Sequence, residues 1–196
     1  MGVDLLLGTS AGLALSTAAG LRVFIPLLIT SAAARLGYLT LTPGMSWIGS
    51  DAALIAFATA AAVEIAAYYV PWLDHLVDLV AGPAAVTAGI IEMAAVTPEL
   101  PPLVRWTIAV LAGGGVAGLA QLGTTLLRLK SSAFTAGLGN SVVATGELVG
   151  AVALAVLGLL APILAAVVVI MLLAWLARRA LRGRARRRPD LAPREP

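Results

Sequence analysis

Cysteine is absent from the chain of 196 residues, and histidine occurs once, at His75. The lack of cysteine excludes disulfides, thiolate metal sites and cysteine nucleophiles. With a single histidine a conventional zinc cluster is not expected either, and the sequence predicts no cofactor. Charged residues make up only 12% of the chain, against about 25% in soluble domains. Because 60% of the residues are hydrophobic, we expect an all-α, polytopic membrane protein.

Positive charge is concentrated at the C-terminal end. Residues 178–196 contain eight arginines and two acidic residues, whereas the rest of the chain has five basic and eight acidic residues. The positive-inside rule then predicts a basic, cytoplasmic tail over residues 178–196, after a single membrane domain over residues 1–177. We expect Arg178, Arg179 and Arg182 to contact anionic lipid headgroups, and we do not expect nucleic acid as a partner.

Long apolar stretches predict about six membrane segments. A crossing needs about 20 apolar residues, so the last stretch is long enough for a hairpin, which Gly158 and Pro162 favour. Pro26 breaks the first stretch, and a polar loop with Arg128 and Lys130 is expected after the fourth. The expected stretches are residues 5–34, 52–70, 72–96, 103–127 and 141–176.

The third stretch is the least regular, because Gly82-Pro83 interrupts it. It is either one kinked span or an interfacial helix that leads into a re-entrant half-helix. Asp74, His75 and Asp78 lie in its first turns, and the aspartates share a helical face. They form either a cation site or the solvated edge of an interfacial helix. The fuller motif of an intramembrane hydrolase or lipid phosphotransferase is missing, so we do not expect an enzyme.

Two segments of the chain resemble each other. Residues 11–22 (AGLALSTAAGLR) and 117–128 (AGLAQLGTTLLR) match at six of twelve positions and both end in Leu-Arg. The match predicts repeat halves at residues 5–97 and 103–177, in inverted orientation. Arg22 and Arg128 should then occupy equivalent places, each close to a break in its helix.

Ionisable residues inside apolar spans are the main functional signal. Glu64 lies within residues 52–70, and Arg22, Glu92 and Glu147 lie in other spans. Each such group costs about 2.5–3.5 kcal/mol on insertion scales, so it marks a functional site by default. The alternative is structural: each glutamate pairs with Arg22 or bonds one helix to another. With Asn140, these residues form the predicted substrate or ion pathway.

An ordered set of motifs resembles the bacterial membrane family filed as domain of unknown function 4126, over roughly residues 8–160. The resemblance implies a compact multi-span protein of the bacterial inner membrane and supplies no established activity. The family's usual pattern has a more polar stretch after the glutamate and a histidine in the fourth span, where this chain has Ala66-Ala67-Tyr68-Tyr69 and Gln121. The motifs that carry the resemblance are Ala19-Gly20-Leu21-Arg22 with Pro26, Glu64, Pro71, Asp74, Asp78, Pro83, Gly113–Gly115, and Gly139-Asn140 with Glu147.

Together these features favour a small-solute or ion transporter or channel, proton-coupled through a buried glutamate. We also expect a homo-oligomer, because six short helices enclose little volume. The alternative is a non-transporting scaffold or lipid-interacting module with an Arg-rich tail.

Overall fold

A computed structural model describes residues 2–68, 71–97, 100–135 and 139–185, without the side chains of residues 71–79 and 180–185. All regular structure in these ranges is helical, which confirms the all-α prediction. The elements are α1 (Gly2–Leu21), α2 (Phe24–Arg35), the 3₁₀ turn η1 (Pro43–Gly49), α3 (Asp51–Tyr68), α4 (Pro71–Val96), α5 (Pro102–Ile108), the π-helical segment η2 (Ala109–Gly114), α6 (Gly115–Thr135), α7 (Asn140–Leu160) and α8 (Pro162–Ala185).

The break predicted in the first apolar stretch lies between α1 and α2, at Arg22 and Val23. Pro26 explains its position. The proline has no N–H to donate to the carbonyl of Arg22, and its ring clashes with that carbonyl in a continuous helix. Within α2 the proline lies in the first turn, where the missing N–H costs nothing. The predicted hairpin at Pro162 is also present, as the turn between α7 and α8.

Two predicted interruptions are absent. Helix α4 continues through Pro83 as one helix, so the break expected at Gly82-Pro83 is absent. Whether this helix spans the membrane or re-enters it stays a prediction. The helical path from Pro102 to Thr135 is unbroken, with a π-helical segment that includes Gly113 and Gly114. Arg128 and Lys130 therefore lie in helix α6, and the polar loop expected there is wrong.

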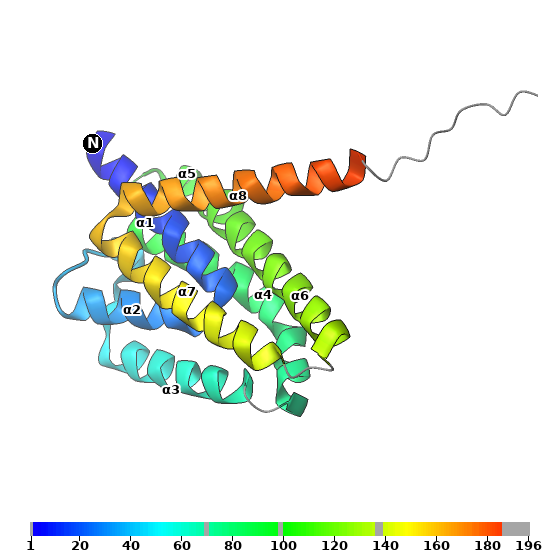
Figure 1. Cartoon of the computed structure of the whole chain (residues 1–196). Coiled ribbons are helices and arrows are strands. Elements are labelled where there is room, and N and C mark those ends of the chain that lie inside the picture. Colours follow the sequence, from blue (N-terminus) through cyan, green and yellow to red (C-terminus); the bar gives the residue numbers. More distant parts are fainter. Residues whose placement is uncertain (1, 69–70, 98–99, 136–138, 186–196) are drawn as a thin grey trace, which may run out of the picture.

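Helix α1 lies at the centre of the bundle and packs against α4, α6, α7 and α8 (Figure 1). Small residues allow these close contacts, as is common between membrane helices. A Cβ atom at Gly113 would lie 2.5 Å from the carbonyl oxygen of Gly89 in α4, so only glycine fits there. Gly20 of α1 is pressed against Ala117 of α6 in the same way. The core of the bundle is thus built largely from alanine and glycine.

Among the described residues, five helices are long and apolar enough to cross a membrane: residues 2–21, 51–68, 102–135, 140–160 and 162–179. Two shorter apolar helices, residues 24–35 and 80–96, pack among them. Helix α8 extends past the rest of the bundle (Figure 1). Its large apolar residues are mostly exposed, and it remains helical through Ala185, beyond the start of the predicted tail.

Candidate functional site

Arg22 lies at the break between α1 and α2, inside the bundle, with 2% of its side chain exposed. Its Nη2 donates to the carbonyl oxygen of Ala144 in α7, at 2.7 Å. The same nitrogen lies 3.4 Å from Oε2 of Glu147, one turn further along that helix. Because α1 ends at Leu21, the arginine also lies beside the negative end of the α1 dipole, where a cation is favoured.

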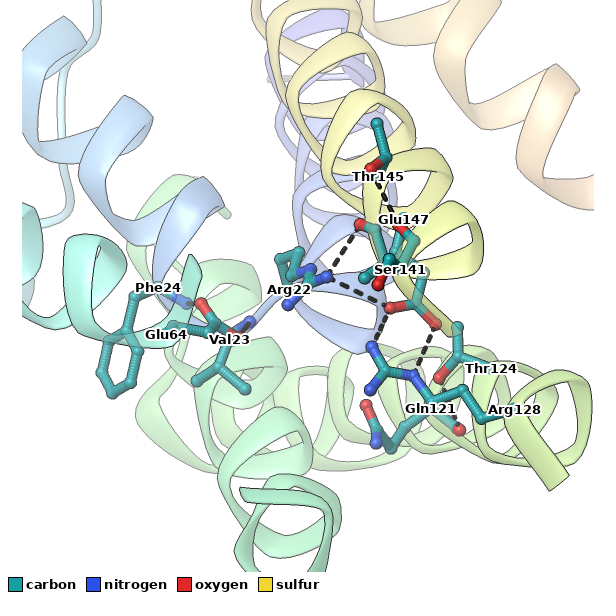
Figure 2. A network of polar contacts seen from close by, with 11 residues as sticks. Arg22, Val23, Phe24, Glu64, Gln121, Thr124, Arg128, Ser141, Thr145 and Glu147 are labelled. Carbon is teal, nitrogen blue, oxygen red and sulfur yellow. Dashed lines mark hydrogen bonds and ion pairs between the residues drawn. The ribbon is translucent and has the colours of Figure 1, made fainter. Parts of the chain in front are cut away.

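Arg128 of α6 holds Glu147 from the other side (Figure 2). Its Nε donates to Oε1 of Glu147 at 3.1 Å, and its Nη2 donates to Oε2. This two-point contact is the strong geometry of an arginine–carboxylate pair. The ring of Tyr68 in α3 contacts both guanidinium groups, with its centroid 3.8 Å from Cζ of Arg22 and 4.0 Å from that of Arg128. One carboxylate and one aromatic ring therefore join two buried cations.

Glu64 of α3 binds the N-terminus of α2. Its Oε1 accepts the Val23 N–H at 2.8 Å, and its Oε2 accepts the Phe24 N–H at 3.1 Å. The first N–H groups of a helix have no partner within the helix and favour negative charge. The Glu64 carboxylate thus caps the N-terminus of α2, which the interruption between α1 and α2 leaves without partners inside the helix. Glu64 also lies within electrostatic reach of Arg22, although its hydrogen bonds go to the backbone.

These residues form a buried charged network that contains two arginines and two glutamates. We define it as Arg22, Glu64, Tyr68, Arg128 and Glu147. Among the described side chains, the two positive and two negative charges of the network balance. Nε and Nη1 of Arg22, however, have no hydrogen-bond partner among the described residues.

Glu92 of α4 lies apart from this network and has no exposed surface. Its Oε2 accepts a hydrogen bond from the Thr30 hydroxyl at 2.8 Å. Its Oε1 has no hydrogen-bond partner, and no cation forms an ion pair with it, among the residues whose side chains the structure describes. A lone carboxylate in an apolar interior is too costly to stay charged, so the surroundings favour the neutral acid.

The other predicted site residue with a described side chain, Asn140, is not among the five residues of the network. Asn140 lies at the start of α7, where its Nδ2 donates to Oγ of Ser132 at 3.0 Å. The side chains of Asp74, His75 and Asp78 lie outside the described residues. In the part of the chain whose side chains are described, no three acidic or histidine residues come together as a metal site.

Arg128 and Tyr68 are the network members that sequence reasoning missed. The sequence holds a signal for Arg128, since Gln121, Thr124 and Arg128 share one helical face, and all three are buried. The Leu-Arg ends of the two matched segments also single out Arg22 and Arg128, which both contact Tyr68 and Glu147. The helix break expected beside Arg128 is absent, because α6 is continuous there. The inverted relation between the two halves stays a prediction.

A bundle of membrane-length helices with charges buried among them defines a multi-pass integral membrane protein. Within that class, the chain belongs to the family described as a domain of unknown function (DUF4126), whose model matches residues 9–182. The match confirms the resemblance seen in the ordered motifs. No curated protein and no solved structure matches the chain.

Proposed function

We propose that the protein forms a pathway for a small solute or ion across the bacterial inner membrane, coupled to proton movement through Glu92. The observation that carries the proposal is the isolation of this carboxyl group. It is fully buried, its one hydrogen bond is to Thr30, and one of its oxygens has no partner among the described residues. Ionisable residues kept inside membrane helices typically belong to substrate pathways or proton relays.

The broken helix supports the same proposal. Many transporters bind substrates where a membrane helix is interrupted, because the interruption leaves backbone groups and helix ends free to bind. Here the break between α1 and α2 lies in the bundle interior, next to Arg22 and Glu64. The network would bind or gate the solute, and Glu92 would carry the proton.

Proton movement in liposomes tests the proposal. The full chain is reconstituted with a trapped pH-sensitive dye, and a pH gradient is imposed in potassium chloride. We expect proton movement that depends on the protein and falls to the level of protein-free liposomes in Glu92→Gln, whose amide keeps the shape but cannot release a proton. Asp51→Asn is the matched control, because Asp51 is an exposed carboxylate paired with Arg35 at 2.6 Å. Unchanged proton movement in Glu92→Gln would contradict the role of Glu92.

A scaffold or lipid-interacting module is the second candidate, and helix α8 favours it. The apolar residues Trp175 and Leu176 are exposed, and they lead directly into the exposed Arg178 and Arg179. Arginines that follow an apolar helix fit anionic headgroups on the cytoplasmic side. This candidate predicts binding to anionic vesicles that falls when Arg178 and Arg179 are neutralised, with no proton movement by the intact chain.

A further inference from the structure

The N-terminus of α2 holds the Glu64 carboxylate as it would hold a free anion. Both carboxylate oxygens accept backbone N–H groups, from Val23 at 2.8 Å and Phe24 at 3.1 Å. Helix N-termini bind carboxylates and phosphates, because their N–H groups lack partners and the helix dipole favours negative charge. The occupant here is a side chain from another helix, α3, so the anion position is filled by the protein itself.

Arg22 supplies an independent observation at the same place. Its guanidinium group is buried, yet Nε and Nη1 have no hydrogen-bond partner among the described residues. Buried donors of this kind are normally satisfied. Arg22 lies between Glu64 and Glu147 in Figure 2, and its charge interacts with both carboxylates. A buried cation that has two unused donors therefore lies next to the anion position.

The local charges also favour an anion there. Removal of Glu64 leaves the positive charge of Arg22 next to the positive end of the α2 dipole. A monovalent anion at this place interacts favourably with both, whether it is attached to α3 or free.

We propose that this position binds a small carboxylate anion, which exchanges with the Glu64 side chain during transport. The proposal rests on the proposed transport function and names its substrate class. A carboxylate fits better than a halide, because its two oxygens can accept the two successive N–H groups as those of Glu64 do. The unused Arg22 donors would hold the anion while Glu64 is displaced.

Chemical rescue tests the site. Glu64→Ala removes Cγ, Cδ and both oxygens, which are the heavy atoms of acetate. The variant is purified in detergent, and thermal unfolding is followed as sodium acetate, sodium chloride or neutral acetamide is added at matched concentrations. We expect acetate to raise the Tm by several degrees in a saturable way, and chloride and acetamide to have much smaller effects.

Glu92→Ala is the matched control, because it removes the same atoms from a buried site that has no helix N-terminus and no described cation. This variant should show no rise in Tm that is specific to acetate. If Glu64→Ala does not fold, Glu64→Gln replaces it. An amide competes poorly for N–H donors, so acetate should stabilise this variant more than the unmodified chain. The inference is overturned if neither Glu64 variant responds specifically to acetate, or if Glu92→Ala responds equally.

A flux measurement separates this inference from the proposed function. Uptake of radiolabelled lactate, a small carboxylate, is compared between proteoliposomes and protein-free liposomes, in parallel with the proton assay. Uptake together with acetate rescue supports both proposals. Rescue without movement of lactate or protons supports the carboxylate site and overturns transport. Proton movement without rescue or lactate uptake supports transport and overturns the carboxylate as its substrate.

Discussion

Glu147 and Glu92 are both buried glutamates in membrane helices, but their partners differ in kind. Glu147 bonds to the guanidinium groups of Arg22 and Arg128. Glu92 bonds to a threonine hydroxyl, and no described cation forms an ion pair with it. Glu147 thus lies between two cations, whereas Glu92 bonds to a hydroxyl in apolar surroundings, which favour the neutral acid.

This difference separates structural charges from groups that can take part in a proton cycle. Releasing a proton from Glu92 requires water or a cation to reach it, which a transport cycle can supply. Replacing Glu147 with a neutral residue would leave Arg22 and Arg128 without the carboxylate that both contact. The same residue type therefore lies in two different kinds of surroundings, and variants at each position test the distinction.

The largest effect is expected for Glu147→Gln. The amide keeps the size of the side chain but leaves Arg22 and Arg128 without the negative charge that both contact. Breaking a buried ion pair by removing one partner costs about 3–5 kcal/mol. We expect a large fall in thermal stability in detergent, measured by the loss of helical circular dichroism. A change under about 1 kcal/mol would contradict the structural role of Glu147.

The sequence predicts those features that local chemistry determines. Pro26 and Pro162 lack an N–H, so the break between α1 and α2 and the turn between α7 and α8 could be predicted from the residues alone. Pro83 was misleading, because neighbouring helices can support a proline within a membrane helix. Arg128 and Lys130 were expected in a polar loop because they are charged and follow an apolar stretch. The chain instead continues there as α6.

Contacts between distant helices were harder to predict. The sequence identified Arg22, Glu64, Glu92 and Glu147 as unusual but could not assign their partners. Arg22 does pair with a glutamate, yet Glu64 bonds to the backbone of α2. That contact depends on how α3 packs against α2, which no local pattern encodes. Tyr68 carried no signal, because an aromatic residue near the end of an apolar helix is ordinary.

A loss of stability of intermediate size is expected for Thr30→Val, which removes the described hydrogen-bond partner of Glu92. Valine has nearly the same shape, but the carboxyl group then loses its hydrogen bond in a fully buried position. Leaving a buried polar group unsatisfied costs about 1–3 kcal/mol. The double variant Thr30→Val with Glu92→Leu removes both polar groups and should recover most of the lost thermal stability. No recovery would mean that Thr30 stabilises the fold in another way.

The smallest effect on stability is expected for Glu92→Gln. The amide oxygen can still accept the Thr30 hydrogen bond, and no described ion pair is broken. A neutral acid and a neutral amide of the same shape should differ by about 1 kcal/mol or less, the size of one hydrogen bond. Thermal unfolding measured beside Glu147→Gln checks this, because one chemical change is then made at both glutamates. Equal losses would mean that Glu92 is also a paired anion, and the contrast between the two sites would be wrong. A small loss at Glu92 beside a large one at Glu147 would support Glu92 as the group that can gain and lose a proton without unfolding the protein.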